Sequence, residues 1–366
     1  MPPVASAAQG GHAAASLPRW RRLHWYKVPL FLLSLFLFIL AITLMKDGAR
    51  DLGPFVRDRL SVTSFADALG FGWLFSYVIM SGSPVAATGL AFLDAGVVDR
   101  LGAYGMIVGS RMGASFIVLF VGFLYVLRGR SRTTSLSMGL LSLSVAGSIQ
   151  ILALGIGVYL LESRIVDHWQ LGAGTVLSGL TDLILDPISA AVNAYLPGWV
   201  VFIIGLGIIV TSFSLFDRSL PEMSVRSEVS TISQFVYRPW VMFLLGSAIT
   251  LISMSVSISL SILVPLSQRG LVRRENIIPY IMGANISTFI DTLLAAVLIR
   301  NPEAFTVVVA EMLSLSLVCA AILFVSYERY KNGLLAFVEW TIRDTRHLAL
   351  FMVSIFVVPL LLLVLG

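Results

Sequence analysis

The chain has 366 residues, of which 57% are hydrophobic and 12% are charged, and its formal net charge is +5. A soluble domain carries about 25% charged residues, so this composition excludes a water-soluble globular protein. Continuous apolar runs also exclude a transmembrane barrel, whose strands would alternate apolar and polar residues. The basic residues lie in short loops between apolar runs, where they set membrane orientation rather than bind nucleic acid. The sequence therefore predicts an all-α polytopic membrane protein, and we expect it to lie in the plasma membrane.

The first 27 residues are rich in alanine and glycine and end in several basic side chains. This composition predicts a disordered, basic N-terminus on the cytoplasmic side. The apolar run from Val28 to Met45 has no small-residue cleavage site after it, so we expect a retained first helix rather than a signal peptide. The single cysteine, Cys319, excludes an intrachain disulfide.

Apolar segments follow one another along the whole chain, at about 28–45, 64–93, 101–127, 134–161, 174–195, 199–216, 240–268, 276–300, 305–327 and 348–366. A helix needs about 20 residues to cross a bilayer. The segments 64–93 and 240–268 are longer than one span, and each has a polar break in its middle. Broken backbone at membrane depth occurs where protein or a water-filled cavity satisfies its polar groups. We expect both segments to be re-entrant helical hairpins.

The chain contains one pattern twice, at an offset of 174 residues. The first copy runs from Met80 to Ser115 and the second from Met254 to Phe289. Identical residues at the offset are Met80, Ser81, Ser83, Gly96 and Gly109, which fall on Met254, Ser255, Ser257, Gly270 and Gly283. The same offset aligns apolar segments on both sides of the motif. The sequence predicts two transmembrane repeats, residues 28–198 and 199–366.

Loop charges indicate how the two repeats are oriented. If neither hairpin crosses the membrane, the arginine-rich loops all fall on one side: those holding Arg128, Arg130 and Arg132; Arg218, Arg226 and Arg238; Arg269, Arg273 and Arg274; and Arg329, Lys331, Arg343 and Arg346. Cytoplasmic loops carry such an excess of basic residues. The pattern predicts inverted repeats with a cytoplasmic N-terminus. It leaves open whether 174–195 and 348–366 cross the membrane or lie flat on it.

Interrupted apolar segments at matching places in two halves are typical of a transporter binding site. Unpaired N–H groups at a helix start attract anions, while freed carbonyls and hydroxyls can hold Na⁺. The candidate substrate-binding residues are Ser81, Ser83, Ser110, Arg111, Ser255 and Asn285. The candidate cation-binding residues are Ser255, Ser257, Thr288 and Asp291. Small residues also serve helix packing in membranes, and this alternative stays open for each serine and glycine. No catalytic residue and no metal other than Na⁺ is expected.

Arg111 and Asp291 lie inside apolar segments, where a charge points to function. The planar guanidinium of Arg111 suits two oxygens of an anion, and Asp291 could hold Na⁺ or carry a proton. Alternatively, the two side chains form a structural pair across the repeat interface. Asp182, Asp186 and Glu311 are expected to lie on polar faces, at helix caps or at the membrane interface.

Three stretches resemble the Na⁺/phosphate cotransporter family, in its bacterial form and the related animal type II form. They are GANIST at Gly283–Thr288 with ENIIPYIM before it, VPLSQRGL at Val264–Leu271, and the weaker GSRMGAS at Gly109–Ser115. The resemblance implies an Na⁺-coupled symporter that binds phosphate between two hairpin tips. The family's Gln-Ser-Ser-Ser motif is altered, because methionines Met80 and Met254 replace both glutamines. Arg111 replaces the first asparagine of the second motif, and Phe289 replaces a threonine.

The leading hypothesis is a sodium-coupled symporter of phosphate or a similar small anion, working by alternating access, with H⁺ as the other candidate coupling ion. The alternative is a degenerate family member that does not transport and acts as a membrane sensor or structural partner. A membrane enzyme would need a nucleophile, base or metal-ligand cluster, which the sequence does not suggest. The expected partners are the transported anion and the lipid bilayer, without nucleic acid, and a homodimer is allowed.

Overall fold

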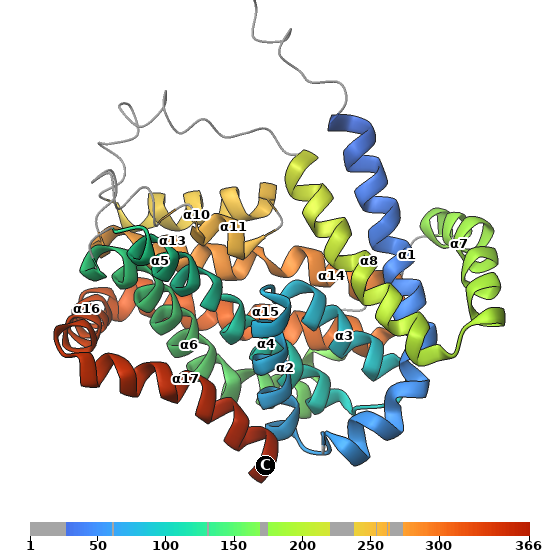
Figure 1. The fold of residues 1–366 in the computed structure, drawn as a ribbon, viewed down its shortest axis with the longest axis horizontal. Helices are drawn as coiled ribbons and strands as arrows, with labels where there is room; N and C mark the ends of the chain where they lie inside the picture. The colour runs from blue at the N-terminus through green and yellow to red at the C-terminus, as the bar shows by residue number, and fades with distance from the viewer. Residues whose placement is uncertain are drawn as a thin grey trace, which may run out of the picture.

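A computed structural model describes residues 27–60, 62–129, 132–168, 175–219, 238–253, 255–261, 263 and 274–366. In the first half the helices are α1 (Lys27–Pro54), the π-helical η2 (Phe55–Arg59), α2 (Phe65–Ile79), α3 (Ser83–Asp94), α4 (Arg100–Ala114), α5 (Phe116–Leu127), α6 (Arg132–Glu162), η3 (Ile165–His168) and α7 (Thr175–Tyr195). In the second half they are α8 (Gly198–Ser219), α10 (Pro239–Ser253), α11 (Val256–Ser261), α13 (Arg274–Ser287), α14 (Phe289–Ile299), α15 (Pro302–Ala321), the π-helical η4 (Ile322–Ser326), α16 (Tyr327–Arg343) and α17 (Thr345–Leu365). The described ranges contain no strand (Figure 1).

Several helices are long and apolar enough to cross a membrane. The described residues contain seven such stretches: Lys27–Arg59, Arg100–Leu127, Ser135–Glu162, Gly198–Phe216, Arg274–Ile299, Pro302–Arg343 and Thr345–Leu365. The chain is therefore a helical membrane protein, as its composition predicts. The stretch 345–365 is among the candidate spans, whereas α7 is not. The expected disordered segment, 1–27, lies outside the described residues except for its last residue.

Helix boundaries recur at the offset seen in the sequence. α2 begins at Phe65 and α10 at Pro239, 174 residues later, and each is 15 residues long. α4 begins at Arg100 and α13 at Arg274, again 174 residues later. The repeated sequence pattern therefore produces the same succession of helices in both halves.

Repeated glycines lie where these helices cross. A Cβ on Gly72 of α2 would lie 2.3 Å from the Met106 carbonyl oxygen of α4, and one on Gly246 of α10 would lie 2.1 Å from the Tyr280 carbonyl oxygen of α13. The second pair of repeated glycines, Gly109 and Gly283, approaches the opposing backbone equally closely. Real Cβ atoms do not approach an oxygen this closely, so only glycine allows these crossings.

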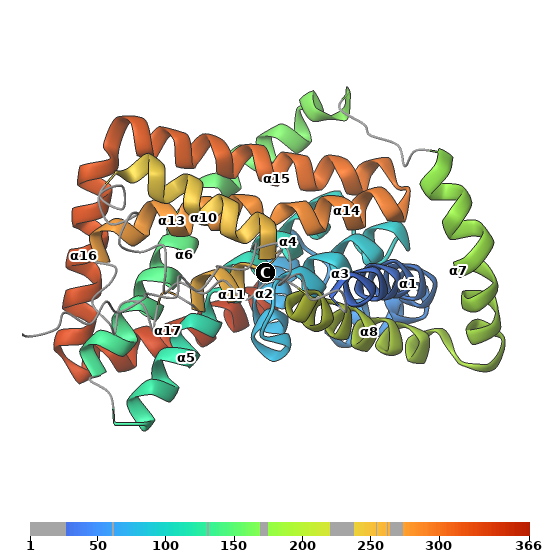
Figure 2. The same cartoon turned by 90° about the horizontal axis from the view of Figure 1, so that it is seen from above.

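The halves contact each other in matching pairs of helices. α1 packs along α8, and α6 packs against α15 (Figures 1 and 2). α3 of the first half contacts α14, and its counterpart α11 contacts α5. Likewise α4 contacts α15, and α13 contacts α6. The core thus forms between the halves as well as within each half.

Two segments differ from the sequence expectation, and the ends of the two halves differ from each other. The segment 101–127 is interrupted at Ser115, where small residues of low helix propensity separate α4 from α5. The segment 305–327 continues through the π-helical turn η4 into α16, which runs at an angle to α15 (Figure 2). The ends of the halves also pack differently: α17 covers α2, where the Tyr77 hydroxyl donates to the Ile355 carbonyl at 3.0 Å, whereas α7 packs on α1 and α8.

Candidate functional site

The first helix break lies within the repeated Met-Ser-x-Ser sequence. α2 ends at Ile79, the next residue Met80 has a left-handed backbone with φ of 58°, and α3 begins at Ser83. A non-glycine residue in this conformation costs about 1–2 kcal/mol, so the surrounding packing must hold it. Between them, Gly82 lies against α4, since a Cβ there would be 2.8 Å from the Ser110 carbonyl oxygen. The break therefore packs directly against α4, the helix that carries Arg111.

Arg111 is the central side chain of the candidate site. It extends from α4, is 1% exposed, and reaches toward both halves of the chain. Its Nη1 atom donates to Ser83 Oγ at 3.4 Å and to Thr288 Oγ1 at 3.3 Å, and its Nη2 atom donates to Thr292 Oγ1. Its Nη2 also lies 3.5 Å from Asp291 Oδ1. One guanidinium thus joins the first helix break to the α13–α14 turn.

The second half surrounds this guanidinium with an acid, two hydroxyls and an aromatic ring. Asp291 is 1% exposed and accepts a hydrogen bond from Thr292 at 2.8 Å. The Phe289 ring centroid lies 4.7 Å from Arg111 Cζ, a distance at which the ring face attracts a cation. Nε of Arg111 and Oδ2 of Asp291 form no hydrogen bond within the described residues. Each charged partner therefore retains an unused polar atom.

Four predicted residues meet at this site: Ser83, Arg111, Thr288 and Asp291. Arg111 and Asp291 form an ion pair between the two halves. The sequence left this pair open as an alternative to separate roles in ligand binding. Thr292 was missed. Its spacing of four residues from Thr288 places both hydroxyls on one helix face, a signal that the sequence does contain.

Other predicted residues do not join this contact set. Ser110 is buried, and its Oγ donates to the Ile107 carbonyl of its own helix at 2.7 Å. Asn285 is also buried, and its Nδ2 donates to the Ile281 carbonyl of its own helix at 2.8 Å. Ser81 and Ser255 are half-buried at the two helix breaks. The side chain of Ser257 lies outside the described part of the chain.

A cavity of about 580 Å³ lies at a different place, beside α1, α7 and the ends of α3 and α14. Its polar lining includes Lys46, Asp47, Arg50, Asp94, Asp186, Ser189, Asn193 and Arg300. Lys46 and Asp94 form an ion pair at 3.2 Å there. The cavity does not include Arg111, whose surroundings are closed to solvent.

Residues 201–341 match the family model described as Na⁺/Pi-cotransporter. This segment is similar to the Na⁺/Pi cotransporters. The match runs from α8 to α16 and includes Thr288, Asp291 and Thr292, so the resemblance read from the sequence motifs is confirmed there. Neither the curated proteins nor the solved structures gave a significant match. Members of the Na⁺/Pi-cotransporter family are transporters rather than enzymes, and the helical membrane fold of this chain agrees with that class.

Proposed function

We propose that this Na⁺/Pi-cotransporter-like protein is a symporter that moves phosphate or a similar small anion together with Na⁺. The observation that carries the proposal is Arg111, an intramembrane cation held between Ser83 of one half and Thr288 and Asp291 of the other. Transport by alternating access needs a site at the interface of two halves that can move relative to each other. The Arg111 contacts fit such an interface.

Two inverted repeats, 28–198 and 199–366, are part of this proposal. The recurring helix boundaries and the matching contacts of α3 with α14 and α11 with α5 support a repeat relation between the halves. We infer that α2–α3 and α10–α11 are re-entrant hairpins, that the N-terminus is cytoplasmic, and that the protein lies in the plasma membrane. A homodimer is compatible with this arrangement.

Coupling between cation and anion can follow from the Arg111–Asp291 pair. While Asp291 neutralises Arg111, the guanidinium is a poor anion site. A cation that binds Asp291, either Na⁺ or a proton, would weaken this pair and release the guanidinium for two oxygens of the anion. The anion would then bind after the cation, and this dependence would couple the two.

The remaining candidate ligands complete the proposed sites. Ser81, Ser83, Ser110, Ser255 and Asn285 are proposed to contact the anion with Arg111, and Ser255, Ser257 and Thr288 to contact Na⁺ with Asp291. Hydroxyls serve both purposes because they donate and accept. Met80 and Met254 cannot donate a hydrogen bond, so Arg111 would supply the anion contact that the family's glutamines provide.

A non-transporting member of the family is the second candidate. It is favoured by the closed Arg111–Asp291 pair and by methionine at both glutamine positions. In that case the pair would be structural, and the protein would act as a membrane sensor or partner.

Uptake of labelled phosphate into liposomes distinguishes the two candidates. The full chain is reconstituted and assayed with an inward gradient of Na⁺ or of choline, then with labelled sulfate and small carboxylates. We expect uptake of one anion that depends on Na⁺, and loss of at least tenfold in uptake in Arg111→Gln, because the anion loses its charged ligand.

Arg329→Gln is the matched control, since it makes the same change at an exposed position of α16. It should retain uptake. Absence of uptake for every anion, in Na⁺ and in a proton gradient, would instead support the non-transporting candidate.

A further inference from the structure

Glu311 is a fully buried acid that the proposed coupling does not use. It lies in the middle of α15 and is 0% exposed, so the expectation of a polar-face or interfacial position is wrong. Neither carboxylate oxygen forms a hydrogen bond within the described residues. The neighbouring Ser314 hydroxyl donates to the backbone carbonyl of Glu311 at 2.9 Å rather than to its carboxylate. A buried carboxylate without partners is strongly unfavourable unless something compensates it.

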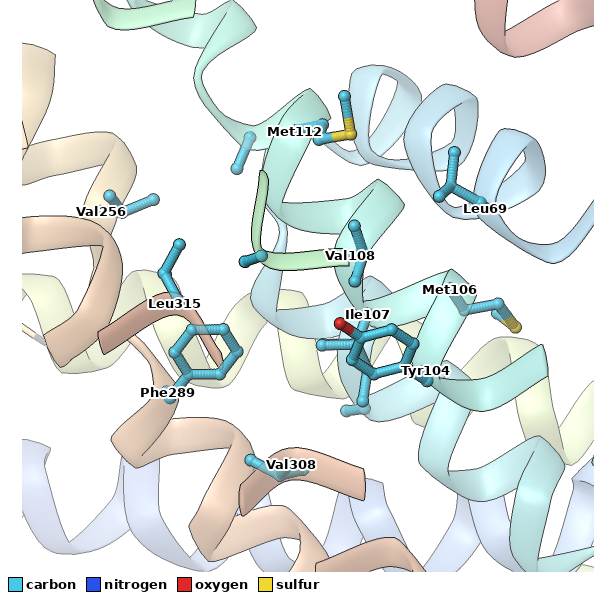
Figure 3. Close-up of a cluster of buried hydrophobic side chains, with 14 of the residues drawn as sticks. Leu69, Tyr104, Met106, Ile107, Val108, Met112, Val256, Phe289, Val308 and Leu315 are labelled. Atoms are coloured by element: carbon cyan, nitrogen blue, oxygen red, sulfur yellow. The ribbon is translucent and has the colours of Figure 1, made fainter. Parts of the chain in front are cut away.

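Polar groups from two other helices face this carboxylate. Tyr104 of α4 and Gln150 of α6 lie within electrostatic reach of it, and both are 0% exposed. The amide nitrogen and oxygen of Gln150 also form no hydrogen bond within the described residues. Figure 3 shows the Tyr104 hydroxyl among the apolar side chains that surround this region. Tyr104 and Gln150 are therefore near enough to interact with the Glu311 carboxylate, but neither makes a hydrogen bond of normal geometry with it.

The surrounding wall is apolar. Val308 and Leu315 flank Glu311 at three and four residues along α15, so all three belong to one helix face. Figure 3 shows both apolar side chains in the same buried cluster as Phe289. On this side the carboxylate has no polar neighbour, and a bound cation or a proton would compensate its buried charge.

The charges of the core do not balance. Arg111, Asp291 and Glu311 are buried in one region, and they sum to one positive and two negative charges when all are ionised. Arg111 is already paired with Asp291 at 3.5 Å. The other buried acid among the described residues, Asp67, lies at the start of α2, where Thr63 and Ser64 satisfy it. The centre therefore lacks one positive charge.

We propose that Glu311, with the Gln150 carbonyl oxygen and the Tyr104 hydroxyl, binds one monovalent cation, Na⁺ or a proton, at a site separate from Asp291. A carboxylate, an amide oxygen and a hydroxyl are hard oxygen ligands of the kind that Na⁺ takes, and a carboxylate without a hydrogen bond is equally able to hold a proton. The site joins α4, α6 and α15, so occupancy would stabilise the contact of α15 with the first half. The proposal concerns binding and does not require that transport occurs.

Thermal unfolding of the purified full chain in detergent tests this site. Tm is measured against Na⁺ concentration, with choline chloride holding the ionic strength constant, and against pH, for the wild type, Glu311→Gln and Glu303→Gln. Glu303 lies on the same helix at an exposed position, so Glu303→Gln is the matched control. Glu311→Gln removes the buried charge at nearly constant volume and should fold at least as well as the wild type without Na⁺.

The two cations give different outcomes. A ligand that binds only the folded state stabilises it by mass action. If Na⁺ binds, Glu311→Gln loses the stabilisation that one Na⁺ provides, while Glu303→Gln keeps it. If a proton binds, Glu311→Gln and the wild type show the same dependence of Tm on Na⁺. The wild-type Tm then falls as pH rises, and the Tm of Glu311→Gln does not show this fall. Glu311→Gln that matches the wild type in both titrations would overturn the proposal.

Gln150→Met provides a second test that leaves the acid in place. It removes the amide at similar length, and we expect the response lost in Glu311→Gln to be weakened in it. These Tm titrations do not measure uptake, so they test this site independently of the proposed function. A protein that shows the cation response here but no anion uptake in liposomes would refute the proposed function and leave this site supported.

Discussion

At the residue scale, the two copies of the repeated pattern differ at one position that decides which polar contacts each copy makes. Position 111 and position 285 correspond at the repeat offset, but one holds arginine and the other asparagine. Asn285 is short and bonds the carbonyl of its own helix, whereas Arg111 is long enough to reach the other half of the chain. The asymmetric chemistry of the site therefore comes from side-chain length and charge within a repeated backbone.

Removing one partner of the Arg111–Asp291 pair should destabilise the protein. Asp291→Asn takes away the carboxylate paired directly with the buried guanidinium, and removing one partner of a buried ion pair costs about 3–5 kcal/mol. We expect a corresponding loss in the free energy of unfolding of the detergent-solubilised protein, measured by denaturant titration.

The double variant Arg111→Gln with Asp291→Asn is the control for this prediction. It removes both charges, so it should recover a large part of the loss. Losses that simply add in the double variant would mean that the two side chains do not stabilise each other.

At the element scale, glycine decides how closely the helices of each half approach. Gly109 of α4 packs against the backbone of α2, and Gly283 of α13 packs against the backbone of α10. A Cβ would lie 2.1 Å from the Leu69 carbonyl oxygen in the first case and 2.1 Å from the Phe243 carbonyl oxygen in the second. Backbone cannot move aside as the end of a flexible side chain can. These crossings fix the position of α4 and α13, and hence of the residues that they carry.

Gly109→Ala and Gly283→Ala should each destabilise the protein, because the added methyl must push two backbones apart. Overpacking of this kind costs about 1–3 kcal/mol. Gly147→Ala is the matched control, since it lies in α6 with nothing within 4 Å of the added Cβ. Removing a helical glycine in open space should be neutral or stabilise by up to about 1 kcal/mol. The comparison is made by Tm, and equal Tm shifts in all three variants would show that the crossings do not depend on glycine.

At the scale of the whole molecule, the two halves form one core through matching contacts. α1 with α8 and α6 with α15 each pair equivalent helices of the two halves. This arrangement fits inverted repeats, which predict that the C-terminal ends of α5 and α15 lie on one side of the membrane and those of α6 and α14 on the other.

Cysteine labelling with a membrane-impermeant maleimide tests this topology. In a Cys319→Ala background, Arg128→Cys and Arg329→Cys should be labelled only from the cytoplasmic side. Ser163→Cys and Glu303→Cys should be labelled only from the opposite side. All four positions are exposed on the folded chain, so burial within the protein does not account for a failure to label. Labelling of Arg128→Cys and Ser163→Cys from the same side would exclude a crossing by α6 and with it the inverted arrangement.

The sequence alone determined the class of protein and most of its helices, and it predicted the repeat and a role for Arg111 and Asp291. These follow from local composition and from spacing along the chain, which require no knowledge of what lies opposite. The sequence did not reveal α16, because its charged face interrupts the apolar pattern.

Only the tertiary structure decided which polar groups meet. Ser110 and Asn285 bond their own helices, while Thr292 contacts the guanidinium and Glu311 lies fully buried. Spacing along a helix fixes which residues share a face, but not which face of another helix lies opposite. Those partners are set by the packing of one half against the other, where the close glycine crossings within each half hold α4 and α13 in place.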